Sequence, residues 1–239
     1  MLNSTFQRLC AWSGIVLMLM FFGAFLYAHF LPPPGPYLTQ DEVVAIYQRD
    51  ANDIRIGFVL MMIGGMFMSP FAGVISFHIR RIDCHVSRLL AYTQLSAGTI
   101  GMLTTFIPAV MFMITAYRPE RAPELTYLMN DMSWFLTVII WPPFLMQNVA
   151  IAAAVFMDKR LNPIFPRWFG YFQLWVALGY VGATLLPFFK SGPFAWNGLF
   201  AFWLPAIVFG PWFVVTAVMV IKAINREEQE TLVSEHSTT

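Results

Sequence analysis

The chain has 239 residues, of which 58% are hydrophobic and only 11% are charged, and its net charge is +1. A soluble domain carries roughly 25% charged residues, so this composition excludes an ordinary water-exposed surface and fits a surface that faces lipid. The near-zero net charge, without a basic stripe along any segment, also predicts no nucleic-acid partner. We therefore expect an integral membrane protein whose main surroundings are the lipid bilayer.

Six apolar runs are each long enough to cross a membrane, because a spanning helix needs about 20 residues. Lipid offers no hydrogen-bonding partners to backbone groups, so each run is expected to be a helix. The sequence thus predicts an all-α fold with one domain, a bundle of six transmembrane helices over residues 1–224, and a polar tail over residues 225–239. The predicted spans are 9–31, 54–79, 89–117, 133–157, 168–189 and 199–221.

The first span and the connection after it carry two further signals. Arg8 precedes an apolar stretch longer than the about 7–15 residues of a signal peptide, so we expect a retained span. Four prolines within residues 32–36 predict an extended exit from that helix. Thr39 and Glu42 then form a helix-start signal, which predicts a short helix to about Arg49 that lies on the outer membrane surface or covers the bundle mouth as a lid.

Prolines interrupt the second to sixth runs, and each one removes a helical hydrogen bond and displaces the carbonyl four residues earlier. We therefore predict kinks in five of the six helices. Pro142 and Pro143 lie about 14 Å along the fourth run at helical rise, near the midplane, where broken helices often line a cavity. Both are candidate ligand-binding residues. The prolines are Pro70, Pro108, Pro142, Pro143, Pro187, Pro205 and Pro211.

The span interiors contain no acidic residue, which argues against ion coupling. They do contain four amides in the inner halves of three helices: Gln94, Gln147, Asn148 and Gln173. These amides either meet and bind a polar group, or hydrogen-bond across helices as packing contacts.

Polar residues gather at the outer ends of the helices, and we take six of them as candidate ligand-binding residues: Arg55, Arg118, Asn130, Asp131, Trp134 and Lys190. Asp131 is the preferred candidate because it directly precedes an apolar run and is placed to pair with Arg55 or Arg118. The alternative is a structural role at the positive start of the fourth helix. Asp131 and His29 are also the candidate catalytic residues, since both can exchange protons near one interface.

Aromatic residues make up 17% of the chain. Trp134, Trp168 and Trp196 fall at predicted interfaces, where tryptophan rings anchor helices. The 15 methionines and a second set of tryptophans lie deeper and are able to shape an adaptable apolar pocket. That second set is Trp141, Trp175, Trp203 and Trp212.

The sequence predicts no metal and no cofactor. Its four histidines do not pair at one membrane depth, as axial haem ligands would. Clustered histidines and carboxylates typical of zinc or di-iron enzymes are missing from the sequence, as are the GxSxG and P-loop motifs.

Lys and Arg residues predict the orientation. With a cytoplasmic N-terminus, nine of the 14 lie in or beside cytoplasmic segments and five in outer ones, as the positive-inside rule requires. We therefore expect a cell-membrane protein with both termini in the cytoplasm.

The leading functional hypothesis is a membrane protein that binds or transports a lipophilic small molecule or lipid. One alternative is a membrane enzyme that acts on such a molecule by acid–base catalysis. Another is a non-catalytic accessory subunit of a membrane complex. The sequence leaves the oligomeric state open.

Overall fold

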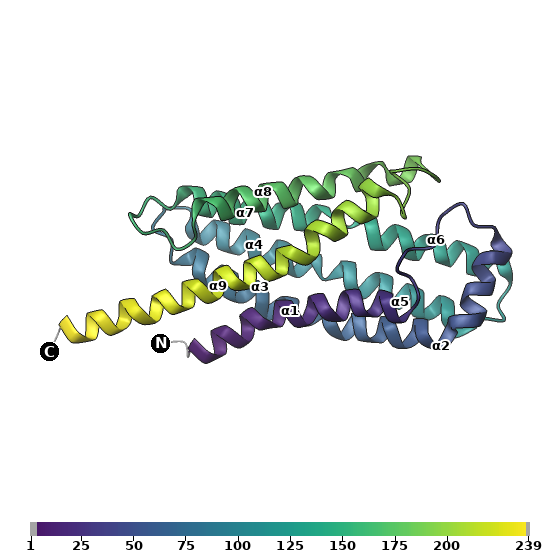
Figure 1. The fold of residues 1–239 in the computed structure, drawn as a ribbon, viewed down its shortest axis with the longest axis horizontal. Helices are drawn as coiled ribbons and strands as arrows, with labels where there is room; N and C mark the ends of the chain where they lie inside the picture. Colours follow the sequence, from purple (N-terminus) through teal and green to yellow (C-terminus); the bar gives the residue numbers. More distant parts are fainter. Residues whose placement is uncertain (1–3, 238–239) are drawn as a thin grey trace.

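The computed structural model describes the backbone of residues 4–237 and the side chains of residues 4–230. This part is helical and without strands, and six of its stretches are long and apolar enough to cross a membrane, so the predicted all-α six-helix bundle is confirmed (Figure 1). The elements are α1 (Ser4–Tyr27), α2 (Gln40–Gly65), α3 (Met68–Arg80), α4 (Ser87–Gly101), α5 (Leu103–Tyr117), α6 (Pro123–Ile139), α7 (Pro142–Met157), α8 (Arg167–Val181), the 3-10 helix η1 (Gly182–Phe188), the π-helix η2 (Leu199–Trp203) and α9 (Leu204–Ser237).

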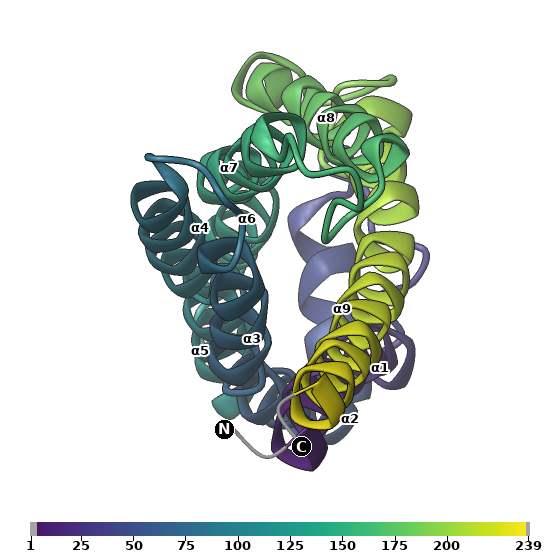
Figure 2. The same ribbon diagram turned by 90° about the vertical axis from the view of Figure 1, so that its left-hand side faces the viewer.

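The six spans close into a ring. The first is α1, the second α2 with α3, the third α4 with α5, the fourth α6 with α7, the fifth α8 with η1, and the sixth η2 with α9. Each span packs against the next one in sequence, and α9 returns to pack against α1. Figure 2 shows this closed arrangement from one end of the bundle. Short connections explain the order, since a short loop places consecutive helices side by side.

Both described chain ends lie at the same end of the bundle, which we call the terminal end (Figure 1). The connections 81–86 and 158–166 lie there too. The opposite end, called the distal end, carries the connections 28–39, 118–122 and 189–198. With an even number of spans, the chain finishes at the end of the bundle where it began, so two connections lie at the terminal end and three at the distal end.

The first span ends earlier than predicted, at Tyr27 instead of residue 31. His29 adopts a left-handed backbone with φ 57°. The amide of Phe30 donates to the carbonyl of Phe25 at 2.8 Å, and that of His29 donates to Leu26 at 3.2 Å. This pair of bonds is a Schellman ending, which turns the chain out of the helix although the following residues are apolar.

The short helix predicted after Thr39 is present, but it continues into the second span. Thr39 and Glu42 form a capping box, with the Thr39 amide donating to the Glu42 carboxylate at 2.7 Å. The backbone kinks at Asp50, which has non-helical angles inside α2. The segment before the kink stands across the distal end of the bundle (Figure 1), with Val43 and Tyr47 buried in the core. We call this segment the lid segment; it packs on the distal end of the bundle, and its placement relative to the membrane surface stays a prediction.

Spans two to six are each broken along their length, and the prolines account for three of these breaks. Pro70 lies in the first turn of α3, Pro142 and Pro143 are the first two residues of α7, and Pro205 is the second residue of α9. First-turn positions tolerate proline because their amides have no helical acceptor. Each of these prolines therefore begins a new helix just beyond a break. The remaining breaks lie at Met102, between α4 and α5, and at the start of η1.

Side-chain hydroxyls satisfy carbonyl groups at the breaks. Ser13 of α1 donates to the carbonyl of Phe67 at 3.0 Å, across the boundary between α2 and α3. Thr104 donates to the carbonyl of Gly101, and Thr105 to that of Met102, both at 2.7 Å. Lipid has no group that would do so, so these hydroxyls make the broken backbone tolerable at membrane depth.

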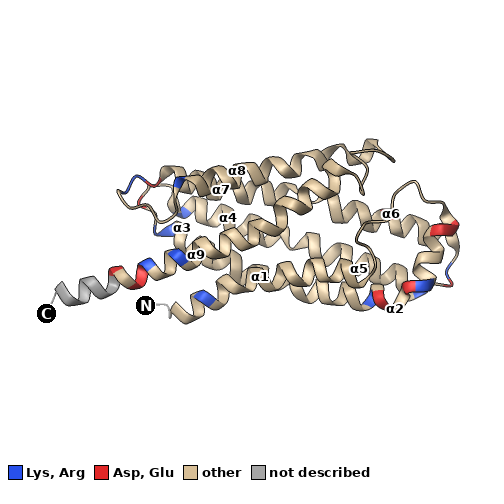
Figure 3. Ribbon diagram, in the orientation of Figure 1, with Lys and Arg blue, Asp and Glu red and all other residues tan. Residues whose placement is uncertain are grey.

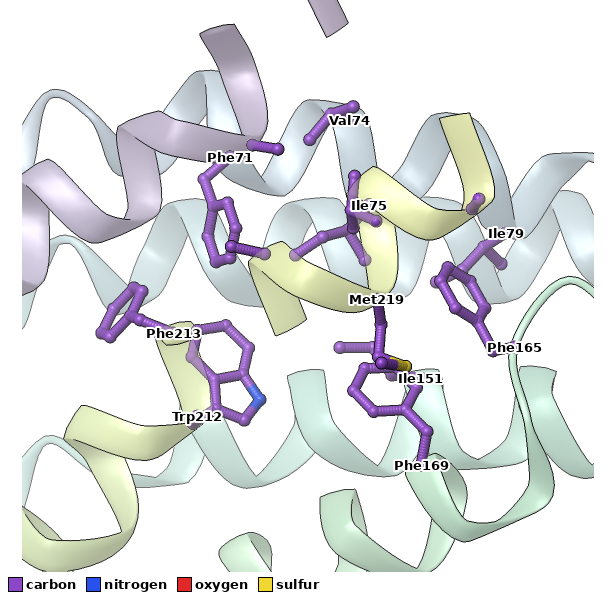
Figure 4. Close-up of a cluster of buried hydrophobic side chains, with 14 of the residues drawn as sticks. Phe71, Val74, Ile75, Ile79, Ile151, Phe165, Phe169, Trp212, Phe213 and Met219 are labelled. Atoms are coloured by element: carbon purple, nitrogen blue, oxygen red, sulfur yellow. The ribbon is translucent and has the colours of Figure 1, made fainter. Parts of the chain in front are cut away.

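The apolar core divides at the same level into two clusters. The cluster toward the terminal end joins α3, α7, α8 and α9, with Phe71, Trp212 and Phe213 packed ring against ring (Figure 4). The distal cluster joins α1, α2, α5 and α6 around Trp134. Phe21 packs against both clusters. The two halves of the bundle are therefore separately packed layers that meet at the midplane.

Charge is confined to the two ends, and the middle of the bundle carries almost none (Figure 3). Large apolar side chains point outward along this middle band, as Leu19, Leu178 and Ile207 do with more than half of their surface exposed. Such a surface is unfavourable in water and favourable in lipid. The band therefore marks the part of the protein that the bilayer surrounds.

The predicted polar tail begins as a direct continuation of α9, which runs to Ser237 and projects beyond the bundle (Figure 1). The last two residues of the predicted tail, 238–239, lie outside the described part. Arg8 pairs with Glu228 at 2.7 Å, and Arg81 pairs with Glu230 at 3.2 Å. These ion pairs tie α9 to the first and second spans at the terminal end.

Candidate ligand cavity

A cavity lies inside the ring at the level of the helix breaks. The cavity is narrow, with a volume of about 90 Å³. Five of the six spans contribute to the wall: Phe21, Phe22, Phe25, Leu31, Thr104, Thr137, Val138, Ile140, Trp141, Phe144, Tyr180, Ala201, Phe202, Pro205, Ala206 and Phe209.

Two helices that separate toward the distal end frame the cavity. α1 and α9 lie together at the terminal end and diverge toward the other (Figure 1). Phe21, Phe22 and Phe25 line the cavity from α1, since Phe25 follows the other two by four and three residues, and positions so spaced lie close together on a helix. Phe202 and Phe209 line it from the sixth span. The π-helical turn η2 lies at this point, and such turns often occur at functional sites.

The wall is aromatic and uncharged. Eight of its sixteen residues are Phe, Trp or Tyr, and none is Asp, Glu, Lys, Arg or His. The hydroxyls of Thr104 and Thr137 donate to carbonyls of their own spans, those of Gly101 and Ser133. Over most of the wall, a ligand would therefore contact only apolar groups and the faces of aromatic rings. Such a surface suits a lipophilic ligand.

Three of the predicted site residues at the distal end lie apart from this cavity. His29 contacts Asp53, with 3.3 Å between Nε2 and Oδ2, and its side chain is 59% exposed. Arg55 donates to the carbonyl of Ala51 at 3.1 Å and to the side chain of Asn52. The Arg118 guanidinium stacks on the neighbouring Tyr117 ring, 5.9 Å from its centre.

Asn130 and Trp134 are buried inside the distal core. The Tyr47 hydroxyl donates to Asn130 Oδ1 at 3.1 Å, which joins the lid segment of α2 to α6. Trp134 is fully buried among Phe30 and Phe112, with ring centres 5.6 and 5.3 Å away. The expectation that Trp134 anchors at the lipid interface is therefore wrong, because its neighbours cover it completely. Neither residue lines the cavity.

Asp131 is half-buried in a shallow groove that Met132, Phe135 and Leu136 also line. Lys190 lies close enough for the two charges to attract each other. The expected pairing of Asp131 with Arg55 or Arg118 is not among the ion pairs formed by the described side chains. Asp131 and His29 both lie outside the cavity wall.

The proline pair lies in sequence between two residues of the cavity wall. Pro142 and Pro143 begin α7 immediately after Trp141, and the wall contains Trp141 and Phe144 on either side of them. The prolines themselves are not part of the wall. They interrupt the fourth span there, between α6 and α7, and so help to position the two aromatic side chains.

The four predicted amides are fully buried, and they differ in how many of their polar atoms have a partner. Gln173 is bonded at both ends, because Trp212 donates to its Oε1 at 2.8 Å and its Nε2 donates to Thr216 at 3.4 Å. The amide of Gln147 has no hydrogen-bonding partner at either atom. Packing contacts therefore explain Gln173 but not Gln147.

Sequence reasoning missed most of the cavity wall. Phe21, Phe22 and Phe25 belong to a run that is apolar on every side, so nothing local distinguishes residues facing lipid from residues facing a cavity. The spacing of these three phenylalanines was an available signal, because it places aromatic rings on one side of α1. Ala206 and Ala201 gave no signal at all, since small residues are common at helix contacts.

Metal-binding groups do not assemble within the described residues, where no three His, Cys, Asp or Glu side chains come together. Comparison of the chain with models of protein families, with curated proteins and with solved structures finds no match. The class of protein follows from the fold alone. Six apolar helices in a closed ring, with charge at both ends and none in the cavity wall, define an integral membrane protein.

Proposed function

We propose that this membrane protein binds, and in its cycle transports, a lipophilic small molecule or lipid in the aromatic cavity. The observation that supports the proposal is the wall itself, with sixteen residues from five spans and no charge. A narrow space between ring faces suits a slender molecule, such as an acyl or prenyl chain, better than a broad one. The acid–base alternative lacks such support, because its candidates His29 and Asp131 lie outside the wall.

The proposal includes an orientation. The terminal end carries the greater share of Lys and Arg, which favours the cytoplasmic side of a cell membrane for that end. The wall is formed beside the helix break of the fourth span by Trp141 and Phe144, and toward the distal end by Phe25 and Leu31. A ligand would then enter from the outer half of the bilayer.

Binding is tested directly by measuring tryptophan fluorescence with bromododecane, since a bromine atom quenches the fluorescence of a tryptophan ring that it touches. The specific signal is the part of the quenching that disappears when Trp141 in the wall is replaced by Phe. Ala206→Phe places a ring into the cavity from the first turn of α9, and we expect at least about tenfold weaker binding, or 1.4 kcal/mol. Ile207→Phe is the matched control, because Ile207 is the next residue on the same helix and 57% of its surface is exposed.

Equal binding by folded Ala206→Phe and by the unmodified protein would refute the cavity as the site. Native mass spectrometry of the purified protein supplies the identity of the ligand. We expect a lipid or lipophilic metabolite to co-purify with the unmodified protein and with Ile207→Phe, and to be lost from Ala206→Phe.

A further inference from the structure

Buried polar atoms without a partner are concentrated beside the cavity. Nine such side-chain atoms occur among the described residues, and five of them belong to four residues of α4, α7 and α8. These are Nε2 of Gln94, both amide atoms of Gln147, Oδ1 of Asn148 and the hydroxyl of Tyr180. Each unpaired buried polar atom costs about 1–3 kcal/mol, so a group of five is not explained by helix packing.

Gln147 of α7 lies against Gly98 of α4, and it fits there because glycine has no side chain. A Cβ atom at Gly98 would lie 2.7 Å from Gln147 Nε2 and 3.2 Å from the Cβ of Ala72. The Gln147 amide therefore occupies the space beside α4 that a side chain at position 98 would need. Gln94 lies one helical turn before Gly98, and its Oε1 accepts a hydrogen bond from Ser76 while its Nε2 remains free.

The same amides lie one turn beyond the cavity wall. Phe144 is part of the wall, and its ring lies against Gly101 of α4. Asn148 donates to the carbonyl of Phe144 at 2.7 Å, which leaves Asn148 Oδ1 without a partner. Tyr180 also belongs to the wall. Phe144 and Tyr180, whose ring centres lie 6.1 Å apart, thus form the part of the cavity wall that is next to these amides.

We propose that Gln147, with Asn148 and Gln94, is a hydrogen-bonding subsite for a neutral polar group at one end of the cavity ligand. The subsite offers donors at Gln147 and Gln94 and acceptors at Gln147 and Asn148, and none of these side chains is charged. A hydroxyl or carboxamide satisfies both kinds of atom, whereas an ion would satisfy only one. This proposal rests on the proposed function and names the ligand class as a lipophilic chain with a neutral hydrogen-bonding end.

Two probes separate this proposal from the one on which it rests. Bromododecane fills the cavity only, and bromododecanol adds a hydroxyl at the end opposite the bromine. We expect bromododecanol to bind the unmodified protein roughly threefold to tenfold more tightly, which corresponds to one neutral hydrogen bond. The quantity to compare between variants is the ratio of the dissociation constants of the two probes. The two probes partition differently into detergent micelles, but this difference is the same for every variant and cancels.

Gln147→Met removes both amide atoms at nearly constant length, and we expect the preference for the alcohol to disappear. Thermal stability should not fall, since no protein group loses a partner. Gln173→Met is the matched control, because Gln173 is equally buried but bonded to Trp212 and Thr216. That control should lower stability and, in the folded protein, leave the preference for the alcohol intact.

Gly98→Ala tests the subsite without deleting it. The added Cβ displaces the flexible end of Gln147, so we expect the preference for the alcohol to fall while the fold remains. If Gln147→Met or Gly98→Ala retains the full preference, or if the unmodified protein shows none, the subsite is refuted while cavity binding stands. If bromododecane itself gives no quenching that depends on Trp141, both proposals fail.

Discussion

The contact between α1 and α2 depends on the absence of a side chain at Gly57. A Cβ at this position would lie 2.7 Å from the carbonyl oxygen of Ala24 and 3.3 Å from the Cβ of Ala28. The closer atom belongs to the backbone, so no change of rotamer relieves the clash. Ordinary contact begins at 3.4 Å, and the two helices must therefore move apart by about 0.7 Å in Gly57→Ala.

We expect Gly57→Ala to destabilise the protein. Overpacking of this kind costs about 1–3 kcal/mol, and the higher helix propensity of alanine offsets roughly 0.5–1 kcal/mol of that cost. The net loss is about 0–2.5 kcal/mol, and its middle value of about 1.3 kcal/mol corresponds to a fall in Tm of roughly 3–5 °C for a chain of this size. Equilibrium unfolding by titration with dodecyl sulfate in mixed micelles measures the free energy directly.

The matched control is Gly73→Ala, in α3 of the same span. A Cβ at Gly73 meets nothing within 4 Å, so only the propensity term remains, and stability should rise by about 0.5–1 kcal/mol. The two identical substitutions are thus expected to have opposite signs. If Gly57→Ala is as stable as Gly73→Ala, close packing at Gly57 does not hold the first two spans together, and the reasoning is wrong.

Two further substitutions test buried hydrogen bonds. Burial on its own raises the pKa of the Asp158 carboxyl, but hydrogen bonds from the Arg160 side chain and from the Ile164 amide hold that pKa below its usual value. The stability that Asp158 contributes is therefore complete above the unfolded-state pKa of about 3.9 and is lost as the pH falls through the lower folded value. Asp158→Asn should cost about 1–3 kcal/mol at neutral pH, and Tm scans should show that difference shrinking at acidic pH; a constant difference would contradict this account. Tyr47→Phe leaves Asn130 buried without its donor and should cost a similar amount. Unchanged Tm would show that the bond between the lid segment and α6 is not needed.

Much of the fold could be predicted from the sequence because its determinants are local. Apolar length fixed the number of spans, and the capping box at Thr39 and Glu42 marked the start of α2. Pro142 and Pro143 marked the break between α6 and α7. The end of the first span was predicted four residues too late, because the left-handed backbone at His29 has no strong sequence signal.

The candidate site was much less accessible to prediction. The charged residues at the outer helix ends led to the prediction of a site at the distal end, yet Asp131 and Lys190 lie outside the cavity wall. In a membrane helix both the lipid-facing and the core-facing sides are apolar, so periodicity does not show which side faces inward. Trp134 illustrates the difficulty, since an interfacial tryptophan and a fully buried one look alike in sequence.

Sequence alone determined that the chain is a broken six-helix membrane protein, since hydrophobicity and proline act within a single helix. Only the tertiary structure decided how the ring closes, where α1 and α9 diverge, and which amides are satisfied. Gln147 and Gln173 are the same residue type and are both fully buried, yet Gln173 is bonded at both ends of its amide and Gln147 at neither. The reason is physical: a hydrogen bond between helices depends on what the neighbouring helix presents, and no single segment contains that information.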